Sequence, residues 1–195
     1  MLTRDRRAQI RRRVCLALWA SPVRYPLERL PFVRRIYDGW SRAHPFDAVY
    51  GTDTSATIPV AKCAPDVLMA AQMSPYGASQ PSIVRAGIAS LPQHDQYAFV
   101  DLGCGKGRPL IVASEFPFRQ LVGIEIAPAL VDMARRNAAL VAMRYPARTP
   151  IEIRVGDATG VSPPAERVVY FMYHPFSRAL VTAIVSNIER LDFEV

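Results

Sequence analysis

Three glycines at alternate positions follow an acidic residue near the middle of the chain, and this spacing is the strongest chemical signal in the sequence. Gly103, Gly105 and Gly107 lie two residues apart, and Asp101 precedes the first of them. Glycines let the backbone turn tightly and let a ligand approach where a Cβ atom would clash. A helix that begins after such a loop offers unpaired N–H groups and a positive dipole end. The pattern predicts a ligand-binding loop between a strand and a helix.

The spacing of this loop argues against a dinucleotide ligand. The dinucleotide pattern needs its third glycine five residues after the first, and that position holds Arg108. An acid just before the glycines instead suits a ligand with an amino-acid tail, because Asp101 can hold an ammonium group directly or through water. We therefore expect a cofactor with such a tail and not NAD.

The elements that position the loop alternate between short apolar strands and helices from residue 97 onward. We predict strands over residues 97–102, 121–126, 151–155 and 168–173, helices over residues 108–116 and 128–141, and a last helix capped by Ser177. The continuous apolar character of the fourth strand predicts burial on both of its faces. Strands separated by helices imply right-handed crossovers and a parallel sheet. The predicted fold class is α/β.

The N-terminal quarter of the chain holds the whole charge excess. Residues 1–50 carry eleven arginines and four acidic residues, whereas residues 51–195 carry 13 basic and 13 acidic residues, so the net charge of +7 lies in the first segment. Such an arm either binds phosphate-rich partners or an anionic membrane surface, or is a solvated extension. We predict an Arg-rich extension over 1–50, a helical cap over 51–96 with helices near 65–73 and 81–91, and a ligand-binding core over 97–195.

Composition limits the class of protein further. Half of the residues are hydrophobic, and no apolar run reaches the length of a membrane-spanning helix, which predicts a globular chain without a transmembrane segment. Three cysteines, Cys15, Cys63 and Cys104, include no Cys-x-x-Cys pair, so we expect neither a disulfide framework nor a metal site. The basic and apolar start of the chain has only the minimum length for a secretion signal, and prolines follow it. We therefore expect the cytoplasm.

The loop and three later motifs resemble the class I S-adenosylmethionine-dependent methyltransferases, which have a Rossmann-like fold. The first motif of that family is similar to residues 99–107, and the later ones are similar to residues 123–126, 156–158 and 173–176. Four motifs in the right order are more specific than the loop alone, because each lies at the carboxyl end of a strand, where open α/β sheets bind ligands. The resemblance covers about residues 97–190, roughly half of the chain.

The resemblance implies the cofactor-binding residues. Asp101 would anchor the amino-acid end of S-adenosylmethionine, and the glycines would line its methionine part and sulfonium. Glu125, which lies 24 residues after Asp101, would accept from the two ribose hydroxyls. Asp157 would accept from the adenine amino group, with the Ala158 backbone nearby. The full set is Asp101, Gly103, Cys104, Gly105, Gly107, Glu125, Asp157 and Ala158.

The resemblance also implies an acceptor side formed by His174, Pro175, Phe176 and Tyr76. Amino-methylating members of the family carry Asn or Asp, two prolines and an aromatic residue, which fix the lone pair of the target amine. Here His174 takes the polar position and a single proline follows. His174 either accepts a hydrogen bond, acts as a base near pH 7, or is only structural. Tyr76 lies in a segment similar to the Tyr-x-x-Ser/Thr segment of several protein-lysine methyltransferases, and it would edge the sulfonium pocket or simply pack in a turn.

We therefore predict an S-adenosylmethionine-dependent methyltransferase that methylates the nitrogen of a protein lysine or of another amine. Two alternatives stay open: an inactive S-adenosylmethionine-binding remnant, and a nucleic-acid methyltransferase that uses the basic arm. The remnant is considered because a complete fold of this family has seven strands, whereas four are predicted here. Such a chain would leave residues 168–173 at a sheet edge and would self-associate there, unless residues 1–96 cover the edge.

Overall fold

The computed structural model describes residues 44–60, 63, 75–173 and 176–192. The predicted helix near residues 65–73 and all but the last residues of the Arg-rich extension lie outside the described residues. The same is true of two predicted acceptor-side residues, His174 and Pro175.

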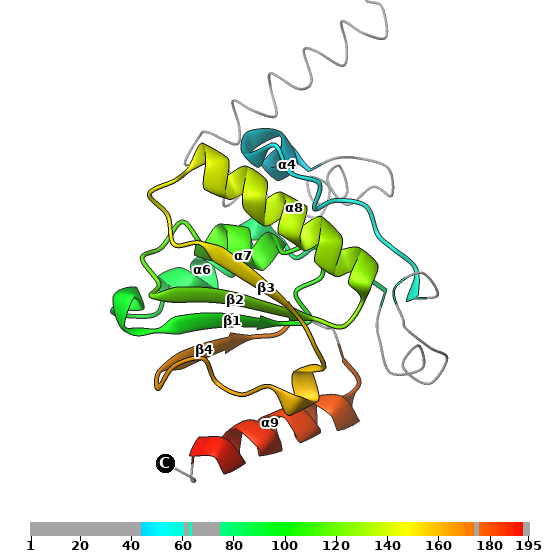
Figure 1. Ribbon diagram of the computed structural model, residues 1–195, viewed down its shortest axis with the longest axis vertical. Helices are drawn as coiled ribbons and strands as arrows, with labels where there is room; N and C mark the ends of the chain where they lie inside the picture. The colour runs from blue at the N-terminus through cyan, green and yellow to red at the C-terminus, as the bar shows by residue number, and fades with distance from the viewer. Residues whose placement is uncertain (1–43, 61–62, 64–74, 174–175, 193–195) are drawn as a thin grey trace, which may run out of the picture.

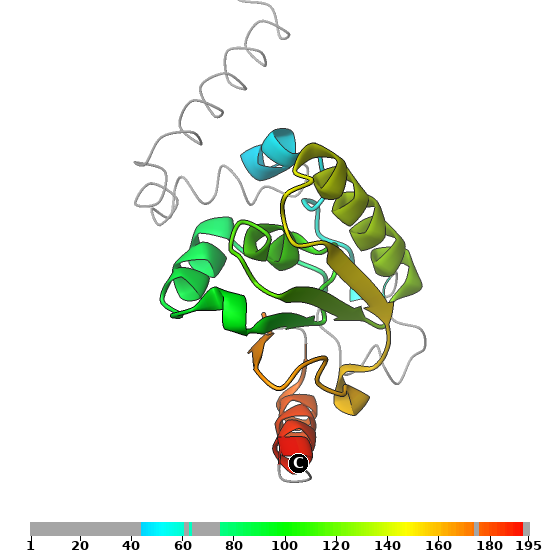
Figure 2. The ribbon, with the colours of Figure 1, turned by 60° about the vertical axis from the view of Figure 1, so that its left-hand side comes forward.

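Four parallel strands form one sheet in the order β3-β2-β1-β4 (Figures 1 and 2). Their bounds are Ala98–Leu102 for β1, Gln120–Glu125 for β2, Ile151–Val155 for β3 and Val168–Phe171 for β4. Because β1 and β2 each have a neighbour on both sides, they are buried along nearly their whole length. The prediction of an α/β fold with a parallel sheet is confirmed. The bounds of β3 are those predicted, and those of the other three strands differ by one or two residues.

The fourth strand differs from its prediction in burial. All four residues of β4 are half-buried, although their apolar sequence predicted two buried faces. Among the described strands β4 pairs with β1 alone, so one of its edges has no neighbour in the described sheet. Apolar character therefore indicated a strand correctly, but it did not indicate how many neighbours the strand has.

Helices lie on both faces of the sheet (Figure 1). On one side are α4 (Pro45–Tyr50), α6 (Pro81–Ala89), α7 (Arg108–Ala113) and α8 (Pro128–Arg144), and on the other is α9 (Arg178–Asp192). A proline stands in the first turn of each helix on the first side, where its missing N–H costs little. The Ser177 hydroxyl accepts a hydrogen bond from the Leu180 N–H at 3.4 Å, as the predicted cap requires. No helix among the described residues is long and apolar enough to cross a bilayer.

Alternate side chains of β1 divide between two cores, as the pleat of a strand requires. Phe99 joins the core under α4, α6, α7 and α8. Val100 and Leu102 join the core under α9, whose Ile184 is completely buried. Asp101 lies on the same face as Phe99, one residue before the strand ends.

The last residues of the predicted N-terminal extension belong to the core. Phe46 of α4 is fully buried and Tyr50 nearly so, and the Tyr50 hydroxyl donates to Glu115 Oε1 at 2.6 Å. The boundary at residue 50 was predicted from the distribution of charge. Phe46 and Tyr50 are uncharged and lie on one face of a short helix, so their burial leaves no trace in the charge count. The described core therefore includes α4, which precedes the predicted boundary at residue 50.

Candidate functional site

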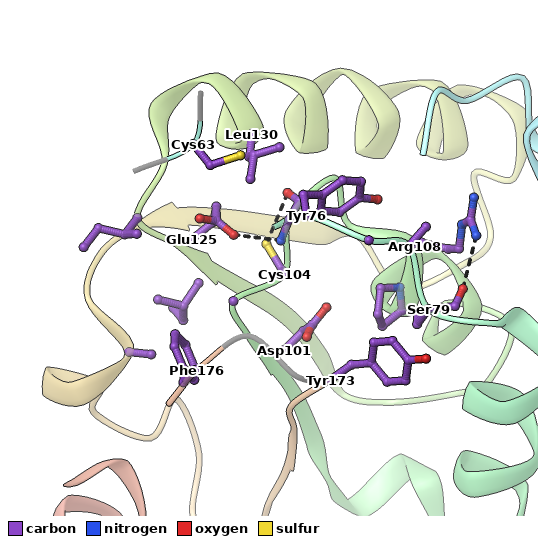
Figure 3. A pocket seen from close by; sticks show the side chains of 18 of the residues that line it. Cys63, Tyr76, Ser79, Asp101, Cys104, Arg108, Glu125, Leu130, Tyr173 and Phe176 are labelled. Carbon is purple, nitrogen blue, oxygen red and sulfur yellow. Dashed lines mark hydrogen bonds between the residues drawn. The ribbon is translucent and has the colours of Figure 1, made fainter. Parts of the chain in front are cut away.

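A cavity of about 200 Å³ lies at the carboxyl ends of the parallel strands, as Figure 3 shows. The sequence-predicted residues that line it are Tyr76, Asp101, Gly103, Cys104, Gly105, Glu125, Asp157, Ala158 and Phe176. Gly107 does not line the cavity and instead immediately precedes α7. Residues from five separate stretches of sequence thus meet at one edge of the sheet, which is the edge where open α/β sheets bind ligands.

The glycine-rich loop has a backbone that other residues could not easily adopt. Gly105 has a φ of +55°, and a Cβ atom on it would lie 2.4 Å from Cε2 of Tyr76. Any side chain at this position would therefore push the Tyr76 ring away from the loop. The N–H groups of Gly103 and Cys104 both donate to the Ile124 carbonyl, at 2.9 and 3.0 Å, and this fastens the loop to the end of β2.

Asp101 is a buried carboxyl group at the end of β1. Its side-chain Oδ2 has no hydrogen-bond partner among the described residues. Burial, together with the nearby charge of Glu125, raises the pKa of Asp101 well above its ordinary value. Leaving a buried polar atom unpaired costs free energy, and an ammonium group in the cavity would supply the missing partner. The residues present therefore fit a ligand with an amino-acid tail.

Glu125 joins the glycine-rich loop to α8. Its Oε2 accepts from the Gly105 N–H at 2.8 Å and its Oε1 accepts from the Ala127 N–H at 2.9 Å. Burial raises the pKa of Glu125, and these backbone N–H groups oppose the shift. Each carboxylate oxygen can accept a second hydrogen bond, so a ribose contact is compatible with this arrangement and stays a prediction.

Asp157 and Ala158 lie beyond the end of β3. Asp157 is exposed, and its Oδ1 accepts from the Thr159 N–H at 2.9 Å, which caps a short 3₁₀ helix, η3 (Ala158–Gly160). Ala158 is buried in the core under α9 and also lines the cavity. Their contacts with an adenine ring stay a prediction.

Tyr76 packs against the glycine-rich loop at Gly105 and lies beside the cavity (Figure 3). Its hydroxyl donates to the Thr54 carbonyl at 2.7 Å, and its backbone forms an antiparallel bridge with Ile58. Burial raises the pKa of Tyr76, so the group is a neutral phenol at physiological pH. Tyr173 and Phe176 line the cavity beside Asp101. The described part of the acceptor side is therefore aromatic.

Sequence reasoning missed the buried polar groups behind the loop. Lys106 and Arg108 are 2% and 4% exposed, although charged residues next to a loop normally face solvent. Both contact the segment around Thr54 and Ser55, more than 50 residues earlier in the sequence. The run of short polar side chains there indicated only a turn. Cys63 also lines the cavity, and nothing in the sequence had indicated a place for it.

One family model and several solved structures are similar to part of this chain. Residues 100–173 match the sequence model of a family described as a methyltransferase domain. No curated protein matches the chain in sequence. Similar solved structures include a magnesium protoporphyrin IX methyltransferase from Synechocystis with bound S-adenosylmethionine, with a TM-score of 0.46 and 18% identity over 57% of this chain and 52% of that one.

Two further structures are similar to part of the chain. An RNA methyltransferase from Salinibacter ruber in complex with S-adenosylhomocysteine has 31% identity over 49% of this chain and 61% of that one, with a TM-score of 0.39. A phosphoethanolamine N-methyltransferase from Haemonchus contortus has 22% identity over 55% of this chain and 22% of that one, with a TM-score of 0.40. The chain spans about half the length of the first of these structures, the Synechocystis enzyme. Residues 100–173 of this chain therefore match a methyltransferase domain, and the fold that holds them is an α/β fold with a parallel sheet of the Rossmann-like kind.

Proposed function

We propose that this chain binds S-adenosylmethionine in the cavity at the strand ends and transfers its methyl group to an amine nitrogen. The observation that carries the proposal is Asp101, a buried carboxyl group whose Oδ2 lacks a partner among the described residues and which lines the cavity beside the glycine-rich loop. The ammonium group of a cationic amino-acid tail would donate to this oxygen and balance its charge.

The predicted cofactor-binding residues other than Gly107 line the cavity, and each would contact a different part of the cofactor. Asp101 would hold the ammonium group, and the backbone of Gly103 and Gly105 would line the methionine chain and the sulfonium. Glu125 would accept from the ribose hydroxyls while it continues to accept from the loop N–H groups. Asp157 would lie at the adenine end, beyond β3.

The acceptor is proposed to be a neutral amine, with a protein lysine as the first candidate. S-adenosylmethionine, when bound, supplies an electrophilic methyl group on a sulfonium. Methyl transfer to an amine that arrives deprotonated needs positioning and exclusion of water more than acid–base chemistry. Tyr76, Tyr173 and Phe176 supply aromatic walls that exclude water and attract cationic groups. His174 and Pro175 complete the proposed acceptor side in sequence.

Cofactor binding is tested by calorimetric titration of the full chain with S-adenosylmethionine and S-adenosylhomocysteine. The expected result is one site per chain for each ligand, and no heat of binding for either ligand would refute the proposal. NAD at micromolar concentration should not displace labelled S-adenosylhomocysteine.

The acceptor class is tested by incubating cell extract with the chain and a methyl-labelled donor. Label that a protease removes and that acid hydrolysis returns as methyllysine supports the amine proposal. Label that ribonuclease or deoxyribonuclease removes would show a nucleic-acid acceptor instead. A chain that binds the donor but labels no fraction would show that binding occurs without catalysis.

A further inference from the structure

One short loop holds both basic side chains of the glycine-rich segment. We call Thr52–Ser55 the brace loop. Arg108 donates from Nε to Thr54 Oγ1 at 2.7 Å and from Nη2 to Ser55 Oγ at 3.0 Å. Lys106 Nζ donates to the Ser55 carbonyl. The brace loop therefore fastens the end of the glycine-rich segment from behind.

The brace loop also holds the aromatic wall of the cavity and the helix α8. The Tyr76 hydroxyl donates to the Thr54 carbonyl at 2.7 Å. The Asn137 side-chain amide donates to the carbonyls of Asp53 and Lys106, at 3.1 and 3.0 Å, and its Oδ1 accepts from the Asp53 N–H at 3.0 Å. Displacing this loop would thus move several groups around the cavity together.

A single buried carboxylate organises the brace loop. Asp47 Oδ1 accepts from the Thr52 hydroxyl at 2.9 Å, the Thr54 N–H at 2.8 Å and the Thr54 hydroxyl at 2.6 Å. Its Oδ2 accepts from the N–H and the hydroxyl of Ser55, at 2.9 and 2.5 Å. Burial acts to raise the pKa of Asp47, but these hydrogen bonds and the charge of Arg108 outweigh it, so the pKa lies below its ordinary value. Arg108 Nη2 lies 3.7 Å from Oδ2.

We propose that Asp47 is a positioning residue for the cofactor site, acting through the brace loop on Arg108 and Tyr76. Arg108 and Tyr76 line the same cavity as Asp101 and Gly105, where the proposed function places the amino-acid tail of the cofactor, and the Tyr76 ring packs against Gly105. The inference rests on that proposed function. It implies that Asp47 controls affinity for the tail and leaves affinity for the nucleoside end unchanged.

The substitution Asp47→Asn tests this with no change in side-chain volume. The N–H groups of Thr54 and Ser55 bond to different carboxylate oxygens. An amide has one acceptor oxygen, so one of the two backbone N–H groups would face an NH₂ donor, and the loop must shift. We expect affinity for S-adenosylhomocysteine to fall about tenfold or more, with affinity for adenosine, which lacks the tail, unchanged within about twofold.

The experiment is a calorimetric titration of the full-length wild type and of each variant with S-adenosylhomocysteine and with adenosine. Ile88→Ala is the matched control, because Ile88 is a buried core residue of α6 that does not line the cavity. The control substitution should lower the affinities for both ligands by the same factor, or change neither affinity. If Asp47→Asn does not fold, Thr54→Val, which removes only the hydroxyl between Asp47 and Arg108, carries the same expectation.

The possible outcomes separate the two proposals. A selective loss of S-adenosylhomocysteine affinity supports the positioning role of Asp47. Wild-type affinity in the folded variant, or an equal loss for both ligands as in a general destabilisation, overturns that role and leaves the proposed function intact. Failure of the wild type to bind S-adenosylhomocysteine would overturn the proposed function, and the role of Asp47 with it.

Discussion

Replacing Asp101 by asparagine should separate the stability of this protein from its affinity for the cofactor. The Asp101 carboxyl is buried, and the pKa is raised by burial first and by the charge of Glu125 second. An unfolded aspartate ionises near pH 4, whereas the folded one holds its proton to higher pH. The free energy of unfolding therefore falls as pH rises between these two pKa values. Asparagine does not ionise, so Asp101→Asn removes this decrease in the free energy of unfolding. We therefore expect a Tm no lower than that of the wild type at pH 7.

The same substitution should weaken binding of S-adenosylhomocysteine. A hydrogen bond between a carboxylate and an ammonium group contributes about 1.5–3 kcal/mol, which corresponds to about a 10- to 150-fold loss of affinity. Binding of the ammonium stabilises the ionised form of Asp101, lowers its pKa and releases a proton. Affinity in the wild type should therefore rise with pH until Asp101 is ionised in the unbound protein, and this dependence should disappear in the variant.

Calorimetry in two buffers of different ionisation enthalpy measures that proton release, and thermal unfolding measures the Tm. Asp95→Asn is the matched control, because Asp95 is exposed and lies away from the cavity. Wild-type affinity together with an unchanged pH dependence in Asp101→Asn would refute the assignment of this residue to the ammonium group. A lower Tm would refute the argument that the buried carboxyl is costly.

Three further predictions follow from other contacts. Glu125→Gln should lower the free energy of unfolding by about 1–3 kcal/mol and should also lower the affinity for S-adenosylhomocysteine. The reason is that an amide has one acceptor oxygen and cannot accept from the N–H groups of both Gly105 and Ala127. An unchanged free energy of unfolding in urea would contradict this. A chain shortened to residues 44–195 should keep its cofactor affinity, whereas one that starts at residue 51 should lose its cooperative thermal transition because α4 is in the core. Burial first, and the charge of Arg108 second, lower the pKa of His44 to about 3, so the free energy of unfolding should fall as pH drops from 6.5 toward 3. Circular dichroism against pH should show this fall in the wild type, and His44→Asn, which keeps an N-terminal cap, should reduce it.

The sequence by itself determined the α/β class, the order of the elements and the edge of the sheet where the cavity lies. These properties depend on local patterns: apolar runs of strand length, prolines in the first turns of helices, and glycines directly after β1. Asp101, Glu125 and Asp157 could be predicted to lie near the site because each comes at or just after the end of a parallel strand, and parallel strands end at a common edge.

Only the tertiary structure decided what each of these side chains contacts and what supports them. Glu125 accepts from the loop N–H groups, and Lys106 and Arg108 turn inward because Asp47 and the brace loop offer them acceptors. Gly105 lies 20 residues from Glu125, and Ser55 and Thr54 lie 51 and 54 residues from Lys106 and Arg108. No local pattern of charge or hydropathy records such pairings. The half-buried state of β4 and the place of α4 in the core likewise depend on which elements are neighbours in space. Burial of a charged group is a property of its surroundings, so residue type and spacing alone cannot predict it.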